Sequence, residues 1–277
     1  MSIMIEVPMV DAASTSFPQR RAFPKSVFLA CYGYPILFIL LHFVFRYNKF
    51  YQSLRPLHRF QFRNKLVATL HAAVATFCAM RIAFFSDWSQ LHLIYNDHPE
   101  TKFVTGLELG YLFQDTISEL YKAARFGIYD KVTLIHHLAF STGIVYYLVI
   151  YGGPAKGDYF IALILLMNAS TPLLHLRWVF EKMEVVGLKL WSVNIGLIGL
   201  FFTCRLYLVY FMYWIYAYRH HEPWYMTMFR IPWFCTVFSS ALIILNGGWL
   251  YALCKRIFAS KTSSCETPVI VLKPKDS

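Results

Sequence analysis

Apolar runs of close to twenty residues recur along most of this 277-residue chain, and they limit what it can fold into. A helix of about twenty residues is what crosses a hydrocarbon core roughly 30 Å thick. The composition agrees, because 57% of the residues are hydrophobic, only 15% are charged and the mean hydropathy is +0.46. Such a chain is not a water-soluble enzyme. We therefore expect an all-α, polytopic membrane protein.

The apolar runs and the polar segments between them predict seven membrane-spanning helices. The third run is the most polar, because it carries four side chains that are costly in lipid unless they face protein or water: Glu108, Gln114, Asp115 and Glu119. The expected spans are residues 27–45, 66–85, 103–120, 132–151, 159–180, 190–218 and 231–253.

The lysines and arginines favour seven spans over six. With seven spans, 16 of the basic residues outside the spans fall on one side and 7 on the other, whereas removing the third span gives 14 against 9. Because cytosolic loops carry the excess of basic residues, the N-terminal segment is expected in the lumen and the C-terminal tail in the cytosol. The net charge of +11 is then a topology signal, and no nucleic-acid partner is expected.

The last five residues read KPKDS, with Lys273 and Lys275 at the fifth and third positions from the end. This pattern resembles a KxKxx retrieval signal, an address that a receptor reads from the cytosol. The alternative is two lysines in a disordered tail. Agreement with the charge distribution favours the endoplasmic reticulum membrane, with coat-complex recognition of the tail and cycling to the Golgi as consequences.

Polar residues inside the spans gather toward one face of the membrane. His71 is expected about five residues, or ~7 Å, below the cytosolic face, and His136 and His137 at the same depth. Asp115 lies near the cytosolic end of the third run. The same half is expected to hold Asn168, Ser170, Thr171, His175, Arg177, Asn194 and Asn246. Such a layer suits a reaction chamber or a lipid headgroup site.

The adjacent histidines cannot share one helix face, because neighbouring residues point about 100° apart. We expect one of His136 and His137 to face the cavity while the other braces it. A neutral imidazole can take a proton from an amine or hydroxyl that attacks a thioester, and Asp115 could orient that imidazole. The competing interpretation is a hydrogen-bonded contact between helices.

The fifth run contains Asn168-Ala169-Ser170-Thr171-Pro172. Pro172 lacks an N–H and is expected to kink the helix, which would free the carbonyl of Asn168 for another partner. The kink could equally serve packing alone.

Three arginines lie within the spans. Arg177 either holds a phosphate bidentately or snorkels to lipid phosphates without a specific role. Arg205 and Arg81 are expected at other depths as structural pairing residues, with Asp87 as the local partner of Arg81.

The stretch LIHHLAFSTG, which holds His136 and His137, is followed about thirty residues later by MNASTPLLHLRWVF. Together with His71 and with GYLFQD, which ends in Asp115, this set resembles the TLC-domain family of endoplasmic reticulum membrane proteins. Its members include ceramide synthases, the translocating-chain-associated membrane proteins and a protein mutated in one neuronal ceroid lipofuscinosis. The resemblance spans roughly residues 60–255 and implies a six-helix bundle that encloses a cavity.

The resemblance implies that His136 and His137 are catalytic, as the paired histidines of ceramide synthases are taken to be, where fatty acyl-CoA meets a sphingoid base. Many smaller relatives have an acidic residue where this chain has Asn168. The acidic ceramide-synthase signature and a homeobox-like domain are also absent from the sequence. The chain is therefore more similar to the small TLC proteins than to a standard ceramide synthase.

The leading functional hypothesis is an acyl-CoA-dependent acyltransferase for a membrane lipid of sphingoid-base or lysophospholipid type, with His136 or His137 as base and Asp115 as its orienter. The substrate would be bound by His71, Asn168, Ser170, Thr171, His175 and Arg177. The alternative is a lipid-binding regulator of membrane composition, or an escort for cargo leaving the endoplasmic reticulum. A metal oxidase is disfavoured, because only one adjacent histidine pair lies inside the membrane.

We expect no bound cofactor and no metal, with acyl-CoA as a co-substrate and membrane lipids as partners. A homodimer is compatible with the sequence. The predicted organisation is a lumenal segment at 1–26, the first span and a basic cytosolic loop at 27–58, a TLC domain at 59–255 and a cytosolic tail at 256–277.

Overall fold

The computed structural model describes residues 24–86, 88, 98–128, 130–150 and 157–263, and all regular structure in these residues is helical. The elements are α1 Lys25–Phe45, α2 Lys49–Ser53, α3 Pro56–Phe85, α4 Pro99–Phe126, α5 Lys131–Val145, η1 Tyr146–Ile150, α6 Asp158–Leu165, η2 Leu166–Ser170, α7 Thr171–Lys182, α8 Leu188–Phe201, η3 Phe202–Tyr207, α9 Leu208–His220, η4 Trp224–Met226, α10 Thr227–Arg230 and α11 Trp233–Ser263.

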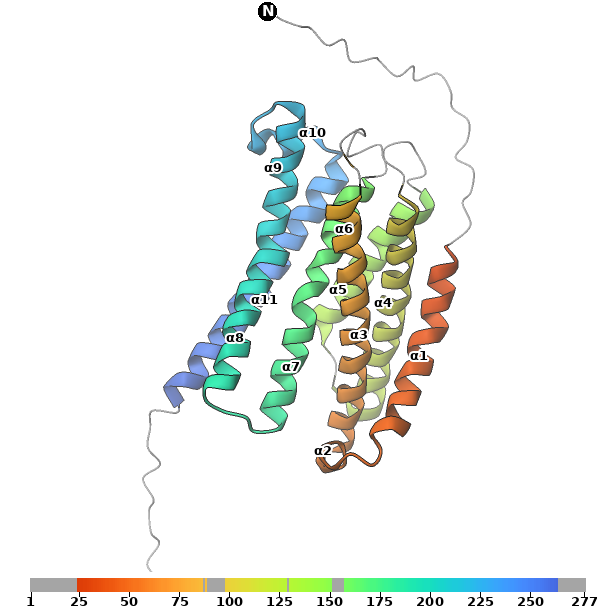
Figure 1. Cartoon of the computed structure of the whole chain (residues 1–277), viewed down its shortest axis with the longest axis vertical. Coiled ribbons are helices and arrows are strands. Elements are labelled where there is room, and N and C mark those ends of the chain that lie inside the picture. The colour runs from red at the N-terminus through yellow and green to blue at the C-terminus, as the bar shows by residue number, and fades with distance from the viewer. Residues whose placement is uncertain (1–23, 87, 89–97, 129, 151–156, 264–277) are drawn as a thin grey trace, which may run out of the picture.

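Six helical segments of the described chain are long and apolar enough to cross a membrane. They are α1, α3, α5 with the start of η1, the continuous segment α6–η2–α7, the continuous segment α8–η3–α9, and α11. Helix α4 has 28 residues and stands in the same bundle beside α1 and α3, although it is too polar to meet the same criterion (Figure 1). The prediction of an all-α polytopic membrane protein is confirmed.

The second long helix begins earlier than predicted. Helix α3 starts at Pro56, where a missing N–H costs nothing, rather than at residue 66. Its first three turns are rich in polar side chains, so hydropathy alone did not predict them as part of the helix. His71 therefore lies fifteen residues into α3, ~22 Å along its axis, while its depth below the membrane face stays a prediction.

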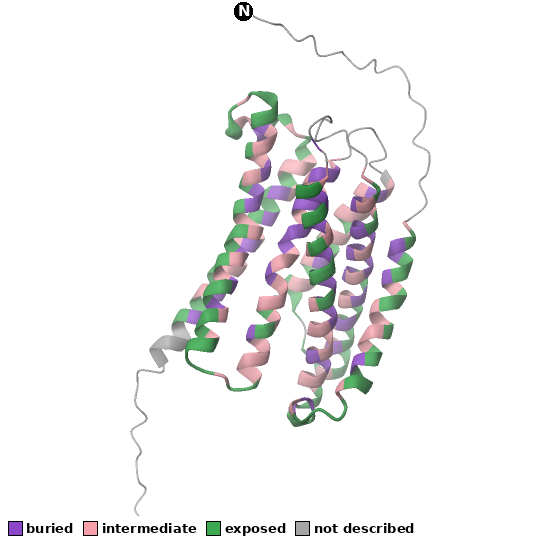
Figure 2. Ribbon diagram, viewed as in Figure 1, coloured by how far each residue is buried: buried purple, intermediate pink, exposed green. Residues whose placement is uncertain are grey.

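Helix α4 can lie in the bundle because its neighbours cover it. Gly106 and Gly110 of α4 face α1, where Ser26 and Ala30 come so close that an added methyl group would overlap them. Helix α1 in turn presents mostly exposed apolar side chains outward, whereas α3 and α4 carry buried residues along their length (Figure 2). The polar residues of α4 are thus shielded from lipid on its outer side.

The break between α6 and α7 is a short 3-10 turn, η2, and Pro172 falls in the first turn of α7. The carbonyl of Asn168 accepts the backbone N–H of Thr171 within this turn. The carbonyl of Asn168 thus has a partner other than the usual one four residues on, as expected, and the tighter turn supplies that partner locally.

Candidate functional site

The polar side chains inside the bundle form two levels along α4. Glu108 marks one level and Asp115 the other, seven residues or ~10 Å apart along the helix axis. Tyr111 lies between them: its ring stacks on His71 with 4.3 Å between centroids, and its hydroxyl donates to Asp115 Oδ2 at 3.3 Å. The sequence predicted a single layer, whereas the structure has two linked levels.

The upper level is built around the carboxylate of Glu108. His71, whose side chain is almost fully buried, places Nε2 at 2.9 Å from Glu108 Oε2, and Asn168 Nδ2 donates to the same oxygen at 2.9 Å. The hydroxyl of Tyr34 on α1 lies 2.7 Å from His71 Nδ1. These bonds are all satisfied when His71 is neutral, with Nε2–H donating to Glu108 and Nδ1 accepting from Tyr34.

The lower level joins Asp115 to His137. Asp115 Oδ1 accepts from Asn64 at 2.5 Å, and Oδ2 lies 3.3 Å from His137 Nε2. The other nitrogen of His137 lies 3.3 Å from the hydroxyl oxygen of Thr116, whose own proton is donated to the carbonyl of Leu112. Both nitrogens of the buried His137 thus face acceptors, a geometry that is satisfied when both carry a proton.

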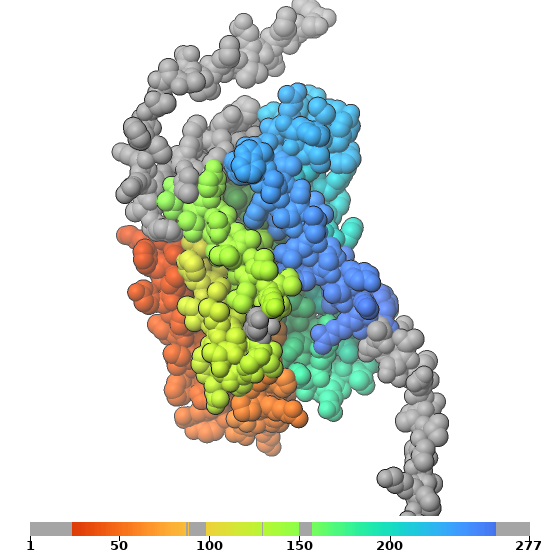
Figure 3. Space-filling view, turned by 180° about the vertical axis from the view of Figure 1, so that it is seen from behind, coloured from red at the N-terminus to blue at the C-terminus, as the bar shows by residue number. Residues whose placement is uncertain are grey.

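His136 points to a different part of the bundle. It packs on the rings of Phe140 and Trp249, with 4.3 Å and 5.0 Å between centroids, where α11 lies beside α5 (Figure 3). Its Nδ1 is buried without a hydrogen-bond partner. Glu108 and Arg205 lie close enough to act on His136 electrostatically, although the contacts of its ring are with aromatic side chains.

From the sequence, Arg205 was expected at another depth than the polar layer. In the structure it lies among those polar residues. Its Nε donates to Ser170 Oγ at 2.8 Å, Nη1 to Asn246 Oδ1 at 3.3 Å and Nη2 to Thr171 Oγ1 at 3.5 Å. Arg205 reaches these residues because it lies near the middle of a long helix. The elements α8, η3 and α9 form one continuous segment of 33 residues.

Two of the predicted binding residues lie apart from the two levels. His175 Nδ1 is 2.9 Å from Thr69 Oγ1, which ties α7 to α3. Arg177 donates from Nε to Asn194 at 2.8 Å and forms an ion pair with Glu181 at 2.6 Å. Arg177 therefore already has a carboxylate partner, one turn along its own helix.

The remaining predicted residues lie near or beyond the limits of the described chain. Arg81 forms an ion pair with Glu100 at the start of α4, and its expected partner Asp87 lies outside the described residues. Lys273 and Lys275 also lie outside them.

Sequence reasoning missed Tyr34, Glu108 and Arg205 as parts of the site. The histidines were singled out because ionisable residues inside apolar spans are costly. Glu108 and Arg205 meet the same criterion, since both are charged groups within long helices. Tyr34 carried no such signal, because tyrosine is common in apolar spans. In the described part of the chain, no group of three or more histidine, cysteine, aspartate or glutamate residues is placed to hold a metal ion.

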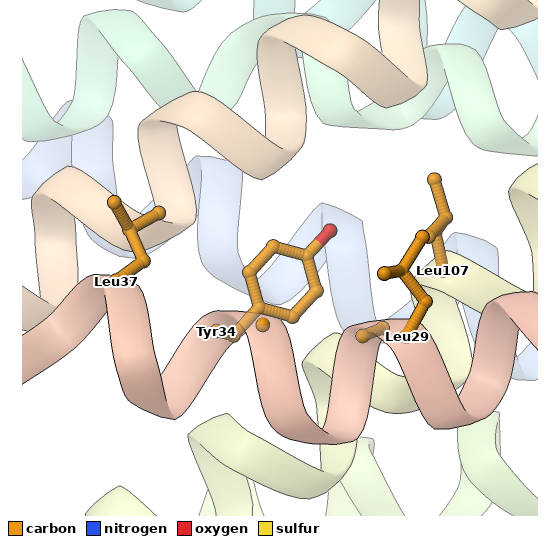
Figure 4. A pocket seen from close by; sticks show the side chains of 6 residues that line it. Leu29, Tyr34, Leu37 and Leu107 are labelled. Carbon is orange, nitrogen blue, oxygen red and sulfur yellow. The ribbon is translucent and has the colours of Figure 1, made fainter.

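An apolar groove of about 250 Å³ opens on the outer surface between α1 and α4 (Figure 4). Tyr34 lies in its wall, and the hydroxyl of Tyr34 reaches His71, so this ring separates the groove from the upper level. The groove is lined by Leu29, Ala30, Gly33, Tyr34, Leu37 and Leu107. The groove lies between α1 and α4 and not inside the bundle, so the predicted enclosed cavity stays a prediction.

A family model described as the TLC domain matches residues 61–255, which is most of the chain. The chain belongs to the TLC-domain family. It is also similar to TLC domain-containing protein 4-B from Xenopus laevis, with 25% identity over 159 residues. That alignment covers 57% of this chain and 57% of the relative, so the chain spans little more than half the length of the relative it matches.

The TLC region begins in α3 and ends in α11, and every long helix between these points contributes to the polar interior. Helix α1 lies outside the matched region and still supplies Tyr34. The contributing side chains are Asn64 and His71 from α3, Glu108 and Asp115 from α4, His136 and His137 from α5, Asn168 and Ser170 from η2, Arg205 from η3 and Asn246 from α11.

Proposed function

We propose that this TLC-domain protein acts in lipid metabolism as an acyl-CoA-dependent acyltransferase, with a membrane lipid of sphingoid-base or lysophospholipid type as acceptor. The observation that carries the proposal is the Nδ1 of His136, which is buried without a hydrogen-bond partner in a bundle whose polar interior draws on every long helix of the TLC region. A general base needs an unoccupied nitrogen within reach of the proton that it takes.

In the proposed step, His136 Nδ1 takes the proton of the acceptor amine or hydroxyl as that group attacks the thioester carbonyl. The new C–N or C–O bond forms, the C–S bond breaks, and the imidazolium returns the proton to the coenzyme A thiolate. His137 is a positioning residue in this scheme, because both of its nitrogens already face acceptors. Asp115 then orients His137 and not the base itself.

We place the protein in the endoplasmic reticulum membrane with its N-terminus in the lumen and its tail in the cytosol. The support is the 16 to 7 distribution of basic residues and the lysines at positions 273 and 275. Coat-complex recognition of the tail and cycling to the Golgi belong to the same proposal.

A second candidate is a lipid-binding regulator or cargo escort without catalysis. One observation favours it: His71, Glu108, Asn168, Asp115 and His137 are all bonded to one another or to neighbours, as expected of a structural network. Such a network could hold a lipid-binding bundle together without any reaction.

The deciding experiment measures acyl transfer by cells and by the purified full-length protein. Cells that lack the protein are complemented with wild type, His136→Asn, His137→Asn or the control His58→Asn, a histidine bonded to Gln61 near the start of α3. Loss of a general base typically lowers the rate by about 10² to 10⁴. We expect His136→Asn to abolish formation of one acylated lipid and the release of coenzyme A in vitro, while His58→Asn restores both. Full rescue by His136→Asn contradicts the transferase and leaves the escort.

A further inference from the structure

Arg205 carries its charge inside an apolar helical segment, and among the residues that the structure describes it forms no ion pair. Its three hydrogen-bond acceptors, Ser170, Asn246 and Thr171, are all neutral. A guanidinium group has five N–H donors, so at least two of them have no acceptor in the described part of the chain. Donors of a charged group that are left without acceptors in such a place are costly and call for a further acceptor.

Within the described residues, no carboxylate is hydrogen-bonded to Arg205. Glu108 attracts Arg205 through space and so offsets part of its charge, while Glu108 Oε2 accepts hydrogen bonds from His71 and Asn168. The other arginines of the spans differ, because Arg177 and Arg81 each have a glutamate partner. Arg205 is thus set apart from both by its neutral surroundings.

The guanidinium is held in place before any ligand arrives. Its carbon lies 4.8 Å from the ring centre of Phe201, and hydrogen bonds fix it to η2 and α11. Residues Phe202–Tyr207 around it form a π-helix, a distortion that is frequent at functional sites. At 1.5 Å per residue, Arg205 is ~25 Å from either end of its helical segment, so it lies in the middle of a segment that is long and apolar enough to span a membrane.

We propose that Arg205 binds the terminal carboxylate of a long-chain fatty acid near the middle of the membrane. A fatty-acid carboxylate matches two parallel N–H donors and carries an apolar chain that belongs in hydrocarbon. A phosphate headgroup would bring more charge and bulk to the same depth. His136, on which Arg205 acts electrostatically, has a buried Nδ1 without a partner that can donate or accept a further bond. This binding goes beyond the proposed function, because it requires no transfer chemistry.

The test is equilibrium binding of radiolabelled palmitic acid to the full-length protein in lipid nanodiscs, in competition with unlabelled hexadecanol and hexadecyl phosphate. Wild type is compared with Arg205→Gln and Arg205→Lys, and with Arg81→Gln, which removes a paired arginine at the end of α3. We expect wild type to prefer the acid over the alcohol by roughly 10- to 100-fold, the range of one charged hydrogen-bonded contact. Arg205→Gln should remove that preference, Arg205→Lys should keep part of it, and Arg81→Gln should keep all of it.

The comparison of ligands on wild type decides the question even if Arg205→Gln does not fold. Equal affinity for acid and alcohol overturns the proposal, and tighter binding of hexadecyl phosphate assigns the site to a phosphate instead. Unchanged preference for the acid in folded Arg205→Gln also overturns it. Acyl transfer plays no part in this readout, so the failure of one proposal leaves the other standing.

Discussion

The contact between α1 and α4 offers a sharp test of the fold. Gly110→Ala adds one methyl group, whose carbon would lie 2.3 Å from the Cβ of Ala30 and 3.0 Å from the backbone oxygen of Val27. Ordinary van der Waals contact begins near 3.4 Å. Because a backbone atom cannot turn aside as a flexible side chain does, α1 must move away from α4 by roughly 1 Å.

The cost of that movement can be estimated against a matched control. Overpacking typically costs about 1–3 kcal/mol, whereas Gly→Ala inside a helix gains up to about 1 kcal/mol by itself. Gly33→Ala measures the helix-propensity gain without any overpacking, since Gly33 lies on α1 and an added methyl group there meets no atom within 4 Å. We expect Gly110→Ala to lose roughly 1–2 kcal/mol of unfolding free energy and Gly33→Ala to lose none.

Thermal unfolding of the full-length protein in detergent measures both variants. One kcal/mol corresponds to a few degrees in a chain of this size, so Gly110→Ala should lower the Tm by roughly 2–8 °C. Gly33→Ala should leave the Tm unchanged or raise it slightly. Equal melting temperatures for the two variants would refute the packing of α1 on α4 and the shielding argument that depends on it.

Three further predictions concern single groups. Tyr34→Phe removes the hydroxyl that bonds His71 and should cost about 1 kcal/mol of unfolding free energy, seen as a fall in Tm; an unchanged Tm would mean that the bond contributes nothing. Glu108→Gln weakens an acceptor of two bonds and should cost about 1–3 kcal/mol, and a Tm equal to that of wild type would contradict the upper level. Replacement of Lys273 and Lys275 by serine should move the protein out of the early secretory pathway, and an unchanged reticular pattern by microscopy would show that these lysines do not retain it.

The sequence predicted the helices well, because length and hydropathy are properties of a continuous segment. It also placed Asp115 and His137 at comparable depths, and the structure brings them within 3.3 Å. The start of α3 was missed, since hydropathy detects contact with lipid and not helical structure: the first turns of α3 are polar.

Rotation about the helix axis was harder to predict than depth. Arg177 and Arg205 look alike in sequence, as single arginines in apolar runs. The sequence interpretation considered a phosphate for Arg177 and structural pairing for Arg205. In the structure Arg177 meets Glu181 one turn away, whereas Arg205 meets only neutral side chains of η2, α7 and α11. The partners of Arg205 come from distant parts of the chain, so a single sequence could not supply them.

The role of α1 follows from the polarity of α4. A helix that carries Glu108 and Asp115 can lie in a bilayer only if protein covers its polar groups, because unsatisfied charges are expensive in hydrocarbon. Helices of the TLC region cover the inner side of α4, and α1 covers its outer side through the close approach at Gly106 and Gly110. Tyr34 of α1 then closes the upper level by bonding His71. A helix outside the matched family region is therefore a physical part of the site, and the polar interior is incomplete without it.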